Sequence, residues 1–409
     1  TPIIATFFFI ESFSSFQLII VSNNQNTLYW QLIIYNVKIH PNKSAQSHIP
    51  ASHGGKYGTK NPDVNVIDFS SNVNPLGCHP GVRRYLKKHL DSISEYPDPN
   101  SMGLRANLAW FTGVPKKQIV VGNGATEIIY NFCKTFLNKK TRVLIPIPTF
   151  SEYEVSAKLC DCKISFFKTM DLSKNLQKFI MKIPRNGCVF ICNPNNPTGI
   201  LIPKNEILKI IAAAKKKSTI VFVDETFIEL VPGNDESVIK HIKNFENLFI
   251  LRSLTKSFGL AGIRIGYGVG SSQIIEPLQK IKIPWNVSNL AQRAASAAIC
   301  YHPFLDKTCK LIKKEKNFIS SNLAKSKKFV CYTSATNFLL VKTKIKSKLL
   351  QKKLLKQKIL IRDCSTFRGL NQNYIRIAIK TRKENIKLLK ALEVLSLIHI
   401  SEPTRLGMI

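Results

Sequence analysis

One lysine in the centre of the chain has neighbours that are unusual for a solvent-exposed lysine. Lys256 lies in the segment SLTKSFGLAGIRIGY (253–267), where hydroxyl side chains flank it, a glycine-rich apolar run follows and Arg264 comes eight residues later. A desolvated lysine near other cations is a tuned nucleophile and proton carrier. The segment therefore predicts a reactive amine at Lys256.

A carboxylate and an amide-rich turn follow two other apolar runs. Asp224 comes directly after TIVFV (219–223), where an acidic side chain could bind a metal, cap a helix or pair with a cationic ring. The run CVFIC (188–192) is followed by NPNNPTG (193–199), which by itself is typical of a Pro/Asn/Gly turn. Neither segment alone defines a chemistry.

A glycine-rich turn follows a third apolar run. QIVV (118–121) leads into GNGATE (122–127), and a helical pattern begins directly afterwards. Free backbone N–H groups and the helix dipole at such a turn can bind phosphate, with the Thr126 hydroxyl as a further donor. A simple capping turn explains the same residues equally well.

The elements that position these residues alternate between strands and helices. Helix spacing is seen in ATEIIYNFCKTFL (125–137) and EILKIIAAAKKK (206–217). We predict an α/β fold with a mostly parallel sheet, covered by helices on both faces, and a ligand at the carboxyl ends of the strands. The predicted buried strands are QIVV (118–121), RVLIPIP (142–148), KISFF (163–167), CVFIC (188–192), TIVFV (219–223), LFIL (248–251) and IRIGYGV (263–269).

The pattern changes after Pro303, and so does the charge. Long lysine-rich helices follow, with strands predicted near 336–342 and 374–379, which indicates a smaller α+β domain. The formal net charge of the chain is +35. Residues 301–360 account for much of it, since they contain sixteen lysines and no arginine. Lysine interleaved with Leu and Ile is typical of solvated helix faces. We therefore expect no nucleic-acid partner, although a non-enzymatic basic binding protein is the competing class.

The cysteines and the two ends of the chain bear on the compartment. Ten cysteines occur without a C-x-x-C spacing, so we expect reduced, mostly buried thiols, no metal site and a cytoplasmic protein. Residues 1–45 lack the basic start of a signal peptide, and polar residues interrupt their apolar runs. We interpret them as an extension from upstream sequence translated in frame, with a membrane anchor as the alternative.

The tail and the remaining divisions complete the predicted organisation. Residues 396–409, SLIHISEPTRLGMI, resemble the translation of a sequencing adapter, so we leave them out of the fold. We predict an N-terminal arm over 46–75 that is part of the small domain and the substrate site. A large domain over 76–300 and a small C-terminal domain over 301–395 follow.

Taken in order, NPNNPTG, VDE and S-x-x-K-x-F-G-L-A-G-x-R-x-G resemble a known family. The chain from about residue 50 to 395 is similar to the fold-type I pyridoxal-phosphate enzymes of the aspartate aminotransferase superfamily. The resemblance implies pyridoxal 5′-phosphate as cofactor, bound covalently by Lys256. It also implies that Asp224 keeps the pyridinium nitrogen protonated, that Asn196 bonds the ring's 3-oxygen and that Phe150 stacks on the ring.

The same resemblance implies the remaining cofactor contacts. Tyr96 of a neighbouring subunit would reach the cofactor phosphate, which implies a homodimer. Phe227 stands where the family often has Tyr, so one hydrogen bond to the 3-oxygen is expected to be missing. The residues expected to bind the phosphate within one chain are Ala125, Thr126, Ser253 and Arg264.

Three local features resemble one branch of this superfamily, the threonine-phosphate decarboxylases of cobalamin biosynthesis. They are H-G-G at 53–55, IDFSSNVNPLG (67–77) and IRDCSTFRGLNQNYIRIAI (361–379). The implied activity is a carbon–carbon lyase reaction that converts O-phospho-L-threonine to (R)-1-aminopropan-2-ol O-phosphate. The alternative is histidinol-phosphate aminotransferase, in which N-E-N-P is more typical than the N-V-N-P at 72–75.

The resemblance implies a substrate site with two arginines, because guanidinium groups bind carboxylate and phosphate in bidentate fashion. We expect Arg368 to be structural or at the rim of this site. The residues implied for the substrate are His53, Gly54, Asn74, Asn196, Arg362 and Arg376.

Overall fold

The computed structural model consists of two compact units, residues 1–47 and 48–409. In the first unit, β1 (Ile4–Ala5), β2 (Phe16–Ser22) and β3 (Leu28–Ile34) form an antiparallel sheet, and α1 spans Lys43–Gln46. The residues that the structure describes are 4–5, 16–22, 28–34, 40–58, 63, 65–233 and 235–397.

The second unit is built on a seven-stranded sheet with the order β5-β11-β10-β9-β8-β6-β7. All neighbouring pairs are parallel except those of β11, which runs antiparallel to β10 and to β5. The mostly parallel sheet is therefore confirmed. Its strands are β5 (Ile119–Gly122), β6 (Arg142–Ile147), β7 (Lys163–Lys168), β8 (Cys188–Cys192), β9 (Ile220–Asp224), β10 (Leu248–Ser253) and β11 (Gly266–Gly270).

Alternate residues of these strands enter two different hydrophobic cores. On β9, for example, Val221 and Val223 belong to one core and Phe222 to the other. This alternation buries both faces of the sheet, as a parallel sheet requires. The helices that pack on one face are α2 (Pro80–Lys87), α3 (Met102–Thr112), α6 (Leu176–Lys182), α7 (Lys204–Lys215) and α10 (Asn289–Cys300), and those on the other are α4 (Gly124–Phe136), α5 (Glu152–Leu159) and α9 (Ser272–Ile281).

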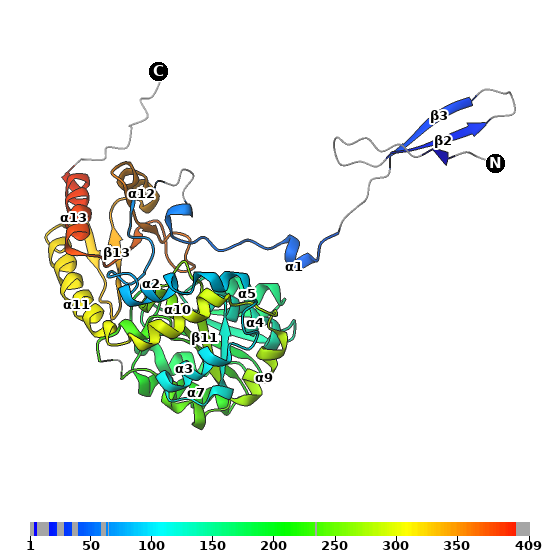
Figure 1. Cartoon of the computed structure of the whole chain (residues 1–409). Helices are drawn as coiled ribbons and strands as arrows, with labels where there is room; N and C mark the ends of the chain where they lie inside the picture. The colour runs from blue at the N-terminus through cyan, green and yellow to red at the C-terminus, as the bar shows by residue number, and fades with distance from the viewer. Residues whose placement is uncertain are drawn as a thin grey trace, which may run out of the picture. The chain divides into compact units, whose positions relative to one another are not determined.

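A second, four-stranded antiparallel sheet has the order β12-β13-β16-β15. The helices of this part lie together around β13, and they bury a separate core that includes Ile319, Leu350 and Leu388 (Figure 1). The elements are α11 (Phe304–Leu323), β12 (Phe329–Cys331), β13 (Phe338–Thr343), α12 (Ser347–Lys356), β15 (Arg362–Asp363), β16 (Tyr374–Ala378) and α13 (Arg382–Leu397).

The segment before residue 75 joins this second sheet region. Strand β4 (Ile67–Asp68) pairs in parallel with β14 (Ile359–Leu360). Phe69 belongs to the same core as β13 and β16. Short 3₁₀ helices among the described residues are η1 (Lys56–Gly58), η2 (Leu90–Ser94), η3 (Lys116–Gln118), η4 (Ser173–Asn175), η5 (Ile228–Leu230) and η6 (Ile239–Asn244).

Two sequence-based expectations are wrong in detail. KISFF (163–167) was expected to be a buried strand, but β7 is mostly exposed because it lies at the edge of the sheet and pairs only with β6. The cysteines are all free, yet only Cys133, Cys188, Cys192 and Cys364 are buried. Of the other six cysteines, Cys300 is exposed and the rest are half-buried.

Several predictions concern residues beyond the described part of the chain. Most of 1–45 and the end of the tail, 398–409, lie outside the described residues, so the interpretation of both ends stays a prediction. The same holds for the predicted domain boundaries. Within the described residues, no helix combines the length and apolar character needed to cross a membrane.

Candidate functional site

A cavity of about 420 Å³ lies at the carboxyl ends of β5, β8, β9 and β10. Each of these strands contributes residues at or just after its last position, as expected for a ligand site in a parallel sheet. The cavity brings together most of the site residues predicted from the sequence, namely His53, Gly54, Ala125, Thr126, Phe150, Asn196, Asp224, Ser253, Lys256, Arg264, Arg362 and Arg376.

Lys256 projects into this cavity from the short helix α8 (Leu254–Ser257) that follows β10. Burial lowers its pKa to about 8, and the charges of Arg376 and Arg264 act in the same direction. Among the described residues, no hydrogen bond or ion pair holds its ammonium group. A lysine with this pKa is neutral in a substantial fraction near pH 7.5, so its amine can act as nucleophile and base.

Asp224 ends β9 and is buried, with each carboxylate oxygen accepting one hydrogen bond. The backbone N–H of Thr226 donates to Oδ1 at 2.8 Å, and the hydroxyl of Tyr153 donates to Oδ2 at 2.6 Å. Burial raises the pKa of Asp224 above its usual value, and these two hydrogen bonds oppose the shift. Both bonds fix the direction in which the carboxylate faces the cavity.

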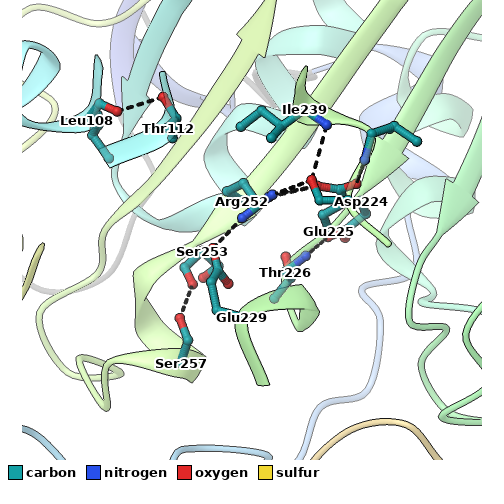
Figure 2. A network of polar contacts seen from close by, with 12 residues as sticks. Leu108, Thr112, Asp224, Glu225, Thr226, Glu229, Ile239, Arg252, Ser253 and Ser257 are labelled. Carbon is teal, nitrogen blue, oxygen red and sulfur yellow. Dashed lines mark hydrogen bonds and ion pairs between the residues drawn. The ribbon is translucent and has the colours of Figure 1, made fainter. Parts of the chain in front are cut away.

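An ion-pair network lies behind the strand ends (Figure 2). Arg252 Nε donates to Glu225 at 2.8 Å, Nη1 to Glu229 at 2.6 Å and Nη2 to Ser237 at 2.7 Å, and both carboxylates are buried. Because successive strand residues point to opposite sides, this network neighbours Asp224 without lining the cavity. It holds the ends of β9 and β10 together and was not predicted from the sequence.

One end of the cavity has the features of a phosphate cradle. The helix α4 begins at Gly124, whose φ is +81°, and its first turn carries Ala125 and Thr126. A Cβ at Gly124 would lie 2.4 Å from Arg264 Nη2, so only glycine lets this guanidinium approach the turn. Helix dipole, hydroxyl and guanidinium together suit a dianion. Ser253 adds a hydroxyl here, 2.6 Å from that of Thr255, a cavity residue not predicted from the sequence.

The opposite wall carries two arginines. Arg376 and Arg362 are directly opposite each other on the antiparallel strands β16 and β15, and both are buried. Arg376 donates from Nη1 to Asn196 Oδ1 at 2.5 Å and from Nη2 to the carbonyl oxygen of Ser70 at 2.7 Å. Its buried Nε has no partner among the described residues. Burial lowers the pKa of Arg376 to about 10, and the charge of Arg362 contributes to this shift.

The N-terminal arm closes the cavity beside Arg362. Arg362 Nη1 donates to Ser52 Oγ at 3.2 Å, and His53 Nε2 lies 2.6 Å from Glu152 Oε1. Tyr130 donates to the other oxygen of Glu152 at 2.7 Å. Burial raises the pKa of Glu152, but the hydrogen bonds from His53 and Tyr130 outweigh it and hold the pKa below its usual value.

Two predicted site residues do not line the cavity. Asn74 is buried behind α8, where its side chain donates to the carbonyl oxygen of Ser257 at 2.7 Å and to Thr308 Oγ1 at 3.0 Å. It therefore supports the Lys256 segment instead of facing a substrate. Tyr96 is 82% exposed and packs near Trp285 with 5.0 Å between ring centroids. Its predicted contact with a second subunit stays a prediction.

The residues missed by sequence reasoning share one property. Tyr153, Glu152 and Arg252 act through partners that are distant along the chain, separated by 71, 99 and 27 residues respectively. A local relationship does exist, because Tyr153 lies three positions after Phe150 and their ring centroids are 5.6 Å apart. Phe227 lies in the cavity wall as expected, packed 5.2 Å from the ring of Phe338.

Comparisons with known proteins identify the family. The chain matches the family "Aminotransferase class I and II" over residues 64–392. It is 34% identical to a histidinol-phosphate aminotransferase from Methanocaldococcus jannaschii, over 82% of this chain and 90% of that protein. It is 35% identical to a putative threonine-phosphate decarboxylase from Caldanaerobacter subterraneus subsp. tengcongensis, over 86% of this chain and 95% of that protein.

Solved structures give the same two names. A histidinol-phosphate aminotransferase from Clostridium acetobutylicum has a TM-score of 0.74 and 32% identity, covering 80% of this chain and 98% of that one. An L-threonine-O-3-phosphate decarboxylase from Porphyromonas gingivalis has a TM-score of 0.72 and 29% identity, with the same coverage.

The cavity fits pyridoxal 5′-phosphate, the cofactor of this family. The absence of a Cβ at Gly124 lets Arg264 reach the start of α4, and the buried carboxylate of Asp224 lines the same cavity with both oxygens hydrogen-bonded. Lys256 supplies a partly neutral amine in the same cavity. With this fit and the family match over most of its length, the chain belongs to the class I and II aminotransferase family of fold-type I pyridoxal-phosphate enzymes.

Proposed function

We propose that this enzyme decarboxylates O-phospho-L-threonine to (R)-1-aminopropan-2-ol O-phosphate, a step of cobalamin biosynthesis. The observation that carries the proposal is the pair Arg362 and Arg376, directly opposite each other on β15 and β16 and both in the cavity wall. Like charges directly opposite in a sheet are unfavourable unless anions lie between or beside them. A substrate with a phosphate and a carboxylate on a short carbon chain supplies two such anions.

The arm adds a second line of support. The H-G-G segment reaches the cavity with His53 and Gly54, and Arg362 bonds the neighbouring Ser52. This segment and the strand pair that carries the arginines are two of the three regions whose sequence resembles threonine-phosphate decarboxylases. The match to the relative of that name spans 362 residues.

The proposed roles follow from the contacts. When bound, pyridoxal phosphate withdraws electrons from the Cα bond that stands perpendicular to its ring. Asp224 holds a proton at the ring nitrogen, and Asn196 and the cradle around Thr126 orient the ring and its phosphate. The two arginines fix rotation about the bond between the substrate nitrogen and Cα, and this rotation decides whether the carboxylate or the hydrogen leaves.

Lys256 has two proposed roles. Its amine would bind the cofactor, and once the substrate amine had taken that place, the buried Nζ would hold a proton inside the cavity. When carbon dioxide leaves, the electron pair of the broken bond remains with the substrate, and Cα must then be protonated. Lys256 delivers that proton to Cα, which completes the balance of the reaction.

Histidinol-phosphate aminotransferase is the second candidate function. Its support is the similarity to several relatives of that name, including the one from Methanocaldococcus jannaschii. Histidinol phosphate carries a phosphate but no carboxylate, whereas the second substrate of that reaction, 2-oxoglutarate, carries two carboxylates. The family fold and the cofactor contacts serve either reaction.

One assay separates the two functions. Protein loaded with pyridoxal phosphate is incubated with phosphothreonine, and separately with histidinol phosphate plus 2-oxoglutarate, while carbon dioxide and glutamate are measured. We expect carbon dioxide and aminopropanol phosphate from phosphothreonine, with Lys256→Ala as inactive control. Glutamate formation without carbon dioxide would contradict the proposal. A protein that carries no cofactor and binds nucleic acid in a salt-dependent manner would support the non-enzymatic class instead.

We also propose a cytoplasmic homodimer in which Tyr96 of one subunit reaches the phosphate end of the other subunit's cavity. Tyr96 is exposed and does not line the cavity of its own chain, which supports this arrangement. A molar mass of twice the chain mass, measured by light scattering, is the expected result. Tyr96→Phe should weaken cofactor retention without changing that mass.

A further inference from the structure

A second cavity adjoins the catalytic one. It has a volume of about 600 Å³ and shares His53, Gly54, Ser70 and Arg362 with the wall of the catalytic cavity. Gly54 lies so close to Ser70 that a Cβ there would meet the Ser70 carbonyl oxygen at 2.6 Å. Residues of the arm line both spaces, and we call the second cavity the antechamber.

One face of α12 forms the outer wall of the antechamber. Lys348, Gln351, Lys352 and Leu355 follow each other at helical spacing and all line it. The helix is held in place at two points. Gln351 Nε2 donates to the carbonyl oxygen of Ile361 at 2.7 Å, and Ser347 donates to Asp363 at 2.6 Å. Lys348 and Lys352 are thus presented toward the antechamber from a fixed backbone.

The charge of this wall is one-sided. Among the described residues that line the antechamber there are cations, Lys348, Lys352 and Arg362, and no carboxylate. Neither lysine has an ion pair or hydrogen bond with a described residue.

The acidic groups nearby are engaged elsewhere. Asp363 accepts from the hydroxyls of Ser347 and Ser365, and Asp68 accepts from both the backbone N–H and the hydroxyl of Ser70. Neither carboxylate lines the antechamber. The two lysines of α12 therefore act on whatever anion enters this space, with no acidic neighbour in the wall to neutralise them.

We propose that the antechamber is the entry route for phosphorylated substrates, and that Lys348 and Lys352 draw the phosphate dianion toward Arg362. Cations spaced along a path attract an anion over about a Debye length, roughly 8 Å at physiological ionic strength. Clefts lined by one sign of charge raise association rates in this way. The inference rests on the proposed function only in requiring a phosphate monoester, which both candidate substrates carry.

The test measures association directly. Holoenzyme is mixed in a stopped-flow instrument with phosphothreonine, or with histidinol phosphate if that is the substrate turned over. The slope of the observed rate of cofactor absorbance change against ligand concentration gives the association rate constant. The variants are Lys348→Gln/Lys352→Gln, which removes both charges, and Lys348→Arg/Lys352→Arg, which keeps them. Lys313→Gln/Lys314→Gln on α11 is the matched control, because it removes two exposed charges outside both cavities.

We expect the association rate constant of the double Gln variant to fall about tenfold at low salt and to converge with that of wild type at high salt. The Arg variant and the α11 control should behave as wild type, and kcat at saturation should not change. An unchanged rate constant in the double Gln variant, or an equal loss in the α11 control, overturns the inference. Failure of the proposed function shows differently, as absence of carbon dioxide from phosphothreonine in every variant.

Discussion

The hydroxyl of Tyr153 donates to Asp224 Oδ2 at 2.6 Å, and both residues are buried. Tyr153 stands at the start of α5 and stacks on Phe190 of β8 with 5.2 Å between ring centroids, so its position is set by the core. A rigid helix residue therefore aims the carboxylate that ends β9. Through this bond, a residue packed in the hydrophobic core orients a carboxylate that lines the cavity.

Replacing Tyr153 by Phe should weaken cofactor binding while leaving the fold intact. The ring keeps its packing, but Asp224 loses a fixed donor. Hydrogen bonds to charged groups contribute roughly 1.5–3 kcal/mol, which corresponds to about a ten- to hundredfold loss of affinity for pyridoxal phosphate. Absorbance titration of the cofactor-free protein measures it. Tyr267→Phe is the control, since that buried tyrosine lies on β11 and makes no contact with Asp224. Equal affinities in wild type and Tyr153→Phe would contradict the prediction.

Replacing Arg362 by Gln should lower kcat/KM for the phosphorylated substrate by at least about tenfold, because a charge-assisted hydrogen bond is lost. The melting temperature of the substrate-free protein should not fall, since the repulsion of Arg376 is relieved at the same time. Steady-state kinetics and a thermal melt check both. Arg368→Gln serves as control, because Arg368 is half-exposed, pairs with Glu154 at 2.7 Å and does not line the cavity. A clear loss of thermal stability in Arg362→Gln would show that the arginine is structural.

Cofactor uptake should report the pKa of Lys256. The neutral amine attacks the aldehyde, so the uptake rate of the cofactor-free protein should rise with pH and level off above about 8. Removing the neighbouring cation in Arg376→Gln favours the protonated amine, so the midpoint should move to higher pH. Absorbance after rapid mixing measures the rate at each pH. A midpoint near 10, as for a lysine in water, would mean that burial does not tune this amine.

A methyl group at residue 54 should disturb substrate binding and spare the cofactor. In Gly54→Ala the new Cβ would lie 2.6 Å from the Ser70 carbonyl oxygen and 2.8 Å from its hydroxyl, so the arm must move. We expect a higher KM with unchanged cofactor absorbance. Gly58→Ala is the matched control in the same arm, because a Cβ at residue 58 would lie 3.7 Å from the His53 carbonyl oxygen, an ordinary van der Waals distance. Equal KM values in the two variants would argue against a role for the arm.

Much of the chemistry could be predicted because it follows strand ends. Runs such as CVFIC and TIVFV predict buried strands. Asp224 is the last residue of one such strand, and Asn196 lies just after the end of the other. The carboxyl ends of parallel strands lie at one edge of the sheet, so residues just after these ends are brought to the same edge for any strand order. Ser253 and Thr126 also lie at or just after strand ends, and both line the same cavity. Asn74 was expected in the site from the resemblance alone; it follows no strand end of the large sheet, and its side chain donates to the carbonyl oxygen of Ser257 at the end of α8.

The sequence by itself determined the strand ends, the reactive lysine and the family resemblance, because each depends on local pattern and spacing. Only the tertiary structure decided which residues contact and support these site residues. The sheet order β5-β11-β10-β9-β8-β6-β7 does not follow the chain, and it is this order that makes β7 an exposed edge. Partners such as His53 and Glu152 meet across 99 residues. Such pairs depend on how helices and strands pack, which no local spacing encodes.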